Sequence, residues 1–461
     1  MEAEREGIRT LEKGFGALIS RIKTAFKYAL ILAMSGILFF LAQVPREEFG
    51  LTFLLFSLAF AGMMGLFFLA TEKISFRKTL FAGLLLRFAV FWFVPNWSDD
   101  FVRFLWDGEL LKIGQNPYAQ TPQEWQKENV DPDNVYRNLL FENLNSPDYY
   151  SVYPPLNQVI FWLGAQASMG FVWNGYYVLR LVLLLSEIGV FFLLWKLLMA
   201  FQLPPKRIFW YWFNPLVIME ITGNLHFEGL VLLFLLASIC AIQKGKLGLS
   251  GGFWGLAVGM KLVPLILLPA LVSLKKFRQN KLAWLSLILA LAVSFGMLLL
   301  DNSWDNFLKS LRLYQGKFEF NASIYYLLRE IGFWVEGYNT IALLTKGLSL
   351  LTLGLILFFS WKRKPSTVPE MVDLWVLIYL IYLILQPVVH PWYIIPAFGL
   401  SLLTARNTFL IWSFTAIFSY QAYSSKEVME RPVFLLIEYS LVLGGIVLDY
   451  FVAKRKLNFA P

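Results

Sequence analysis

Charged side chains, cysteine and histidine are scarce in this 461-residue sequence. Charged residues make up 15% of it and hydrophobic residues 58%, against about 25% and 45–50% in a typical soluble domain. A chain with so few polar groups cannot cover a folded surface in water, so the composition predicts a protein that lies in a bilayer. The single cysteine, Cys240, excludes an internal disulfide. The two histidines, with no close carboxylate cluster, indicate a metal site only weakly. We therefore predict no metal ligand, and a divalent cofactor stays an unsupported alternative.

The sequence contains long apolar runs that charged residues do not interrupt as they would in a soluble protein. Runs near 20 residues match the length that crosses about 30 Å of hydrocarbon, and the sequence shows no ten-residue alternating pattern of a membrane barrel. We therefore expect an all-α polytopic membrane protein with about 12–14 transmembrane or re-entrant helices. The predicted crossings and longest apolar runs are residues 28–45, 51–70, 79–94, 176–196, 225–242, 282–300, 340–360, 371–388, 391–404, 408–423 and 432–452.

The net charge of +9 comes from lysines and arginines in short links between the apolar runs. This is the positive-inside pattern of membrane proteins and argues against a nucleic-acid partner. The long links 95–153 and 301–339 carry more acidic than basic side chains, so we place both on the outer side. Segments 154–170 and 249–274 do not fit the resulting alternation as full crossings, and prolines open or interrupt them. We predict that both are re-entrant or broken helices; a misassigned basic cluster is the alternative.

Several polar side chains fall at the ends of predicted membrane helices, where charge is costly and indicates function. They are Asp99, Asp100, Arg103, Arg180, Glu220, His226 and His390 near the predicted outer side, and Lys261 inside the broken segment 249–274.

These side chains also have structural interpretations. Asp99 and Asp100 suit the N-terminus of a helix over residues 101–113. Asp107 and Glu109 suit a solvated face of the same helix. Arg180 forms an alternative structural pair with Glu187, and the two histidines are alternatively packing residues at the interface.

Residues 98–108, which begin Ser98-Asp99-Asp100, and the following Gly114-Gln115-Asn116-Pro117-Tyr118 resemble the first outer loop of GT-C glycosyltransferases. Further motifs recur in the same order at residues 153–156, 214–216, 261–264 and 320–326. The set is most similar to the dolichyl-phosphate-mannose-dependent enzymes that add the first mannose of GPI anchors, and to bacterial polyprenyl-phosphate-mannose relatives. Where the eukaryotic enzymes carry Asp-x-Asp, Asp100 matches the second aspartate and Ser98 replaces the first, which weakens metal binding by a paired motif.

The resemblance, over residues 79–400, implies inverting transfer of a sugar, mannose by resemblance alone, from a polyprenyl phosphate to a hydroxyl. The acceptor is lipid-, glycan- or protein-linked and lies at the outer face. Asp100 is then the base, and Asp99 orients it or the acceptor. The side chains implied to bind the donor phosphate or sugar are Lys261, His390, Arg180, Arg103, Glu220, His226, Asn321 and Tyr153. The expected partners are the lipid-linked donor, a glycan or lipid acceptor and membrane lipids, without nucleic acid.

Two other classes fit a chain of many crossings. A transporter or flippase explains the helices and broken segments, although the paired internal repeats typical of transporters are not visible. A non-catalytic partner subunit is the second alternative. In the transferase hypothesis, the regions are a cytoplasmic arm (1–27), two accessory helices (28–78), a GT-C-like catalytic membrane module (79–300), a second outer loop (301–339) and C-terminal helices (340–461). The compact chain without a targeting extension favours a bacterial plasma membrane.

Overall fold

The computed structural model describes residues 2–425 and 427–458. These residues fold into helices joined by turns, and their one β-contact is an isolated parallel bridge between Phe320 and Val388. The prediction of an all-α membrane protein is confirmed.

The elements up to residue 300 are α1 (Glu2–Leu41), α2 (Phe49–Leu69), α3 (Phe76–Val90), α4 (Asp100–Lys112), α5 (Pro122–Glu128), α6 (Val135–Glu142), α7 (Pro155–Ser168), α8 (Val172–Ala200), η1 (Pro205–Arg207), α9 (Ile208–Trp212), α10 (Pro215–Val217), η2 (Ile218–Gly223), α11 (Glu228–Gln243), α12 (Leu247–Met260), η3 (Val263–Leu267), α13 (Leu268–Ser273), α14 (Lys275–Arg278), α15 (Lys281–Phe295) and η4 (Gly296–Leu299). Beyond it lie α16 (Ser303–Lys317), α17 (Ile324–Glu336), α18 (Ile341–Arg363), α19 (Val368–Leu385), η5 (Pro391–Ile394), α20 (Ile395–Ser401), α21 (Thr408–Thr415), η6 (Ala416–Ser424) and α22 (Pro432–Asn458). The element η2 is a π-helix and the other η elements are 3-10 helices.

Seven helices in the described residues are long and apolar enough to cross a membrane: Arg21–Leu41, Phe49–Leu69, Val172–Ala200, Lys281–Leu299, Ile341–Arg363, Val368–Leu385 and Pro432–Val452. They coincide with seven of the predicted runs. The run 225–242 belongs to a pair of helices bent by 109°. Residues 391–404 and 408–423 are not continuous helices, because each is split into a 3-10 and a short α-helical part. In segment 391–404, Pro391 lies at the start of η5 and Pro396 at the start of α20. Proline lacks the N–H that a helix interior needs.

Both segments that we predicted not to cross as full helices are short or broken. Helix α7 has 14 residues and is about 21 Å long, which is less than the hydrocarbon thickness. Segment 249–274 contains α12, which ends at Met260, then η3 and α13. Helix α7 packs against α4 with little space, since a Cβ on Gly108 would lie 2.2 Å from the carbonyl oxygen of Phe161.

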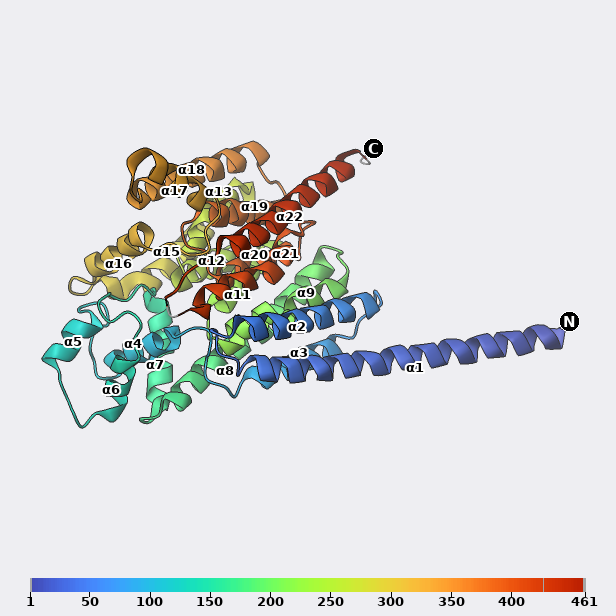
Figure 1. Cartoon of the computed structure of the whole chain (residues 1–461). Coiled ribbons are helices and arrows are strands. Elements are labelled where there is room, and N and C mark those ends of the chain that lie inside the picture. The colour runs from blue at the N-terminus through green and yellow to red at the C-terminus, as the bar shows by residue number, and fades with distance from the viewer. Residues whose placement is uncertain (1, 426, 459–461) are drawn as a thin grey trace.

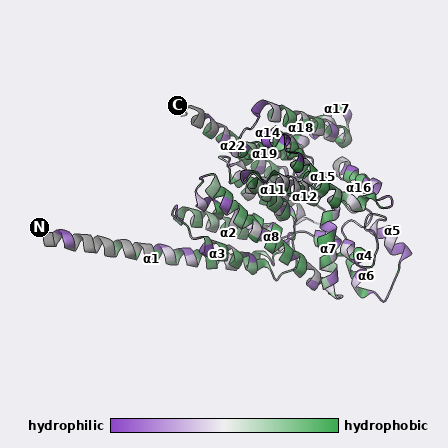
Figure 2. Cartoon of the chain, turned by 180° about the vertical axis from the view of Figure 1, so that it is seen from behind, coloured by the Kyte–Doolittle hydropathy of each residue, from purple (hydrophilic) through white to green (hydrophobic). Residues whose placement is uncertain are grey.

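The termini and the predicted outer loops lie at opposite ends of the molecule (Figure 1). Helices α4–α7 and α16 gather at one end, whereas the marked N and C ends lie at the other, and α1 extends well beyond the neighbouring helices. Residues 2–41 form one helix, so the predicted arm continues into the first crossing. The view from behind shows the same division, with apolar residues dominating the helices between the two ends (Figure 2).

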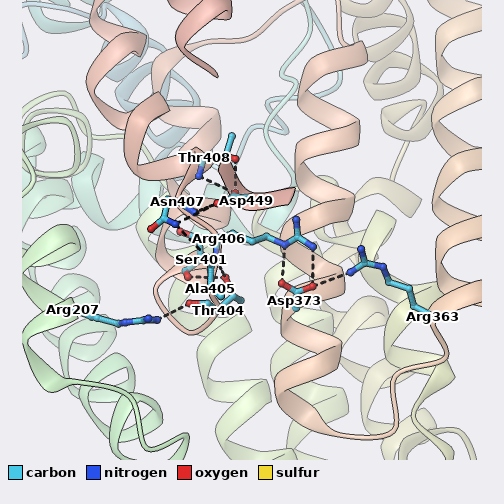
Figure 3. Close-up of polar contacts among 10 residues, drawn as sticks. All are labelled: Arg207, Arg363, Asp373, Ser401, Thr404, Ala405, Arg406, Asn407, Thr408 and Asp449. Carbon is cyan, nitrogen blue, oxygen red and sulfur yellow. Dashed lines mark hydrogen bonds and ion pairs between the residues drawn. The ribbon is translucent and has the colours of Figure 1, made fainter. Parts of the chain in front are cut away.

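A set of paired charges, here called the termini-side network, joins the C-terminal helices (Figure 3). Asp373 on α19 receives two hydrogen bonds from Arg406, at 2.8 and 2.9 Å, and one from Arg363 at 2.9 Å. Asp449 on α22 accepts from the backbone of Asn407 at 2.6 Å and from the backbone and hydroxyl of Thr408 at 3.1 and 2.6 Å. Asp449 thus caps α21 from another helix.

Candidate active site

The bend between η2 and α11 carries His226. Residues 218–223 form a π-helical turn, a feature that often marks functional sites, and Leu225 has a φ of +66°. The Nδ1 of His226 lies 3.0 Å from Oε2 of Glu220, and Glu220 also accepts a hydrogen bond from Tyr420 at 2.5 Å. Because a carboxylate only accepts, we assign the imidazole proton to Nδ1. The other nitrogen, Nε2, is buried and has no hydrogen-bond partner among the described residues.

Asp100 is the first residue of α4 and faces that free nitrogen. Its Oδ2 lies 3.9 Å from Nε2 of His226, and its side chain is 29% exposed. Burial and the charge of Asp100 raise the pKa of the Tyr153 phenol, so Tyr153 also faces this carboxylate. In the described part of the chain, the Asp100 carboxylate accepts no hydrogen bond. It is therefore open to a ligand.

Asp99 occupies the N-cap position of α4, yet its side chain makes no capping hydrogen bond. Instead Nη2 of Arg46, from the link between α1 and α2, donates to Oδ2 of Asp99 at 2.7 Å. The hydroxyl of Ser98 accepts from the Asp100 backbone at 3.3 Å. The alternative that both aspartates lie at the helix N-terminus is therefore confirmed for their positions, although the side chain of Asp99 makes no capping hydrogen bond.

The two histidines lie in one stack of rings. His226 stacks on Trp392 with 3.6 Å between ring centroids, and Trp392 stacks on His390 at 4.5 Å. Phe320 extends the stack beyond His390 at 4.9 Å. Burial, His226 and Lys261 lower the pKa of His390 to about 3. His390 is therefore neutral near pH 7, and its Nε2 lies 3.2 Å from the Tyr314 hydroxyl.

Lys261 lies where α12 breaks. Its backbone is extended, with φ −155° and ψ 137°, and η3 begins two residues later. The ammonium pairs with Glu228 and lies 4.0 Å from the ring centroid of Tyr393. The Lys261 side chain is 34% exposed whereas Glu228 is 4% exposed. A small crevice adjoins this pair, and Val263, Leu383 and other apolar side chains line it.

A family model described as alpha-(1->6)-mannopyranosyltransferase, N-terminal domain, matches residues 24–276. This match covers more than half of the chain. The chain belongs to this mannosyltransferase family. No curated protein and no solved structure matches the chain. The family match includes α2 and the second half of α1, as well as α4, the π-helical bend and Lys261. The carrier of the sugar and the side of the membrane are matters for the proposal below.

The first predicted outer loop of the mannosyltransferase, residues 95–153, is held by buried polar contacts. Arg103 donates to Asp107 at 2.7 Å and to the Tyr149 carbonyl at 2.9 Å. Asp107 is fully buried and also accepts from Ser151 at 2.6 Å and Gln158 at 2.9 Å. Since Glu109 is 6% exposed, the prediction of a solvated face over Asp107 and Glu109 is wrong. The contacts of Arg103 therefore support the loop. Its predicted binding of phosphate stays a prediction.

Arg180 is buried and surrounded by backbone carbonyls. Its guanidinium donates to Thr222 at 2.6 Å, Gly223 at 2.7 Å and Phe93 at 2.7 Å, and also to Phe91. These contacts join α8 to the end of α3 and to the π-helical turn. The alternative pairing of Arg180 with Glu187 is wrong, because Glu187 pairs with another guanidinium, Arg87, at 2.7 Å with both side chains fully buried.

Asn321 supports the ring stack from the second predicted outer loop, residues 301–339. Its φ is +47°, a conformation that asparagine adopts more readily than most residues. Its side-chain amide donates to the Val389 carbonyl at 3.3 Å and to Glu438 at 3.1 Å. The neighbouring Phe320 exchanges two backbone hydrogen bonds with residues 387 and 389, each at 2.9 Å. Asn321 therefore fixes the segment that carries His390, and its predicted binding role stays a prediction.

Two residues of the site, Arg46 and Tyr314, escaped the sequence analysis. Arg46 lies in a region that we treated as accessory, although the rule for charges at helix ends applies to it equally. Tyr314 belongs to α16. Among the described residues, no three His, Cys, Asp or Glu side chains form a group that could hold a metal ion.

We use the name Asp100 cluster for Asp100, His226, His390, Lys261 and Trp392.

Proposed function

We propose that this mannosyltransferase moves a mannosyl unit from a polyprenyl-phosphate donor to a hydroxyl of a mannose-containing acceptor, and forms an α-(1→6) linkage. The observation that carries the proposal is the Asp100 carboxylate. It is part-exposed, accepts no hydrogen bond from the described residues and lies beside the unprotonated nitrogen of His226. The linkage rests on the name of the matching family, and the lipid carrier rests on the resemblance of the loop motifs to GT-C enzymes.

In the proposed reaction, Asp100 accepts the proton of the acceptor hydroxyl. The oxygen attacks the anomeric carbon, the bond between that carbon and the phosphate oxygen breaks, and the polyprenyl phosphate leaves with the electron pair. The configuration at the anomeric carbon inverts. Phosphate is a good leaving group, so one base suffices, whereas glycoside hydrolysis needs two carboxylates. A positioned base contributes about 10²–10⁴-fold.

His226 completes the proton path in this scheme. Glu220 holds the Nδ1 proton, so Nε2 presents a lone pair toward Asp100. Protonated Asp100 passes its proton to this nitrogen, and the buried Glu220 stabilises the imidazolium that forms. Trp392 fixes the plane of the imidazole by stacking on it.

Lys261 is the proposed ligand of the donor phosphate. Its ammonium is part-exposed, lies at the break of α12 and adjoins an apolar crevice. A polyprenyl phosphate needs this combination, because its headgroup is anionic and its first isoprene units are apolar. His390 is neutral, so with Tyr314 and Tyr393 it offers hydrogen bonds to the phosphate without adding charge. We assign Arg180 and Arg103 to positioning, since their contacts go to other protein groups.

The active site faces the outer side in this proposal. The acidic links 95–153 and 301–339 belong to that side by the charge rule, and α4–α7 and α16 lie opposite the termini (Figure 1). We place the chain in a bacterial plasma membrane. A flippase is less well supported, because the family match is to a transferase.

The test is transfer by the purified protein in detergent. The donor is a short polyprenyl phosphate linked to β-mannose, and the acceptor is an α-(1→6)-mannobioside. We expect free polyprenyl phosphate and an α-linked trisaccharide in equal amounts, read by mass spectrometry and NMR. An α-linked donor is expected not to react. Failure to release polyprenyl phosphate, together with movement of the intact donor across vesicles, would favour the flippase.

A further inference from the structure

The link between α1 and α2 is bound directly to the segment that leads into Asp100. Asn96 donates to the Ala42 carbonyl at 3.1 Å, and the Trp97 indole donates to the Val44 carbonyl at 3.3 Å. In the other direction, Arg46 donates to the Trp97 carbonyl at 3.4 Å. The first two helices thus hold the residues just before the proposed base.

Arg46 also meets the carboxylate next to that base. Its Nη2 lies 2.7 Å from Asp99, and its guanidinium carbon lies 4.7 Å from the ring centroid of Tyr423. Burial acts most strongly on Tyr423 and raises its pKa; Arg46 lowers this pKa, and the charges of Asp100 and Asp99 raise it. Arg46 therefore contacts both Asp99, the residue next to the proposed base, and Tyr423.

We propose that Arg46 is a positioning residue that cancels the charge of Asp99, so that Asp100 acts as a base without a free carboxylate beside it. The proposal rests on the proposed function, in which Asp100 takes the acceptor proton. Two adjacent carboxylates disfavour each other's ionised form, whereas a nearby cation favours it. Without Arg46, the negative charge of Asp99 would lie unbalanced beside Asp100 and disfavour the ionised form of the base.

The exposure of Arg46 and Asp99 argues against a role that is only structural, in which the pair would hold helices together. The Arg46 side chain is 23% exposed and that of Asp99 is 44% exposed, so neither is required to fill the core. The other titratable groups that face Asp100 are His226 from the bend, Tyr153 from the first outer loop, Tyr314 from α16 and Tyr423 from η6. Arg103, on the same helix as Asp100, is neutralised by Asp107. The substitutions of Arg46 and Asp99 alter none of these residues, although Arg46→Gln also removes the contact with the Tyr423 ring.

The experiment measures kcat against pH for four proteins at saturating donor and acceptor, because the acidic limb of kcat reports the base in the bound enzyme. In Arg46→Gln, the unpaired Asp99 raises the pKa of Asp100, so the acidic limb moves up by about 0.5–1 pH unit. In Asp99→Asn, the cation stays and the limb moves down by a similar amount. In the double variant Arg46→Gln/Asp99→Asn, both charges are gone and the limb returns to the wild-type pH.

Two further variants separate charge from folding. Arg46→Lys keeps the charge and is expected to keep the limb in place even if the rate falls. Lys206→Gln removes one cation from the surface pair with Glu72, beyond the opposite end of α2, and leaves the limb unchanged. An unmoved limb in Arg46→Gln, with a lower rate at every pH and no return in the double variant, would overturn the proposal. Asp100→Asn tests the proposed function separately, because full activity of this variant would show that Asp100 is not the base.

Discussion

The termini-side network and the Asp100 cluster use charge in opposite ways. At the termini side, Asp373 pairs with two arginines and Asp449 caps α21 with both of its oxygens (Figure 3). In the cluster, the carboxylate of Asp100 accepts no hydrogen bond from the described residues and Nε2 of His226 is buried without a partner. Both regions lie at ends of apolar helices, so location alone does not distinguish them. They differ in whether other protein groups pair with the charged side chains.

This difference follows from the cost of burying polar groups. An unpaired polar group in an apolar protein costs on the order of 1–3 kcal/mol, so folding alone favours full pairing. The termini-side network meets that demand and needs no ligand. The Asp100 cluster leaves hydrogen-bonding capacity that the described residues do not use, and we propose that the substrate uses it. We expect substitutions in the first region to change stability and those in the second to change transfer.

Asp100→Asn gives the largest expected effect. It removes the base but no hydrogen bond of the carboxylate, so kcat should fall on the order of 10³-fold while the thermal midpoint stays unchanged. The matched control is Asp373→Asn, which breaks the pairs with Arg406 and Arg363, lowers the midpoint and retains transfer. Radiolabel transfer and differential scanning fluorimetry measure the two readouts. Near-normal transfer by Asp100→Asn would end its assignment as the base.

Lys261→Met is the next largest. Loss of the cation at the proposed phosphate site should lower kcat/KM for the donor by about 10²-fold. The same change leaves Glu228, which is 4% exposed, without its partner and should lower the thermal midpoint. Lys261→Met/Glu228→Gln removes the unpaired charge, so the midpoint should recover while transfer stays low. Recovery of transfer along with the midpoint would show that Lys261 acts only through Glu228.

The sequence predicted those features that depend on local pattern. Seven crossings follow from the lengths of apolar runs, and the break beyond Lys261 follows from Pro264. Long-range partners were not visible: Arg46 and Asp99 are 53 positions apart, so the predicted role of Asp99 did not include its partner Arg46. Asp107 looked solvated because the groups that bury it lie more than 40 positions away.

The sequence predicted that the motifs of the site lie at one end of the molecule, but not how they contact each other. His226 and His390 were both placed at one end, and the structure brings them together through Trp392. That contact depends on two bends and could not be derived from spacing. Segment 391–404 was expected to cross as one helix, and the prolines at its start show why it does not.

Arg180→Gln is a structural change next to the cluster. The substitution leaves buried carbonyls of residues 91, 93, 222 and 223 short of a donor, which should cost about 2 kcal/mol. We expect a lower thermal midpoint. KM for the donor should stay within about twofold in the folded fraction, because a substitution raises KM when it removes a contact with the substrate, and Arg180 contacts only protein groups. A selective rise of KM without loss of stability would return Arg180 to the phosphate site.

The smallest expected effect belongs to Asp449→Ala in the termini-side network. Asp449 supplies acceptors to the start of α21, where the backbone N–H groups of Asn407 and Thr408 would otherwise be unpaired. Loss of a capping side chain costs about 1 kcal/mol, so the thermal midpoint should fall slightly and kcat and KM should not change. Asp449→Asn keeps an acceptor and should lie between the two proteins. A change of donor KM in Asp449→Ala would mean that the two ends of the molecule are coupled, because α21 runs on into η6, whose Tyr420 and Tyr423 contact Glu220 and Arg46.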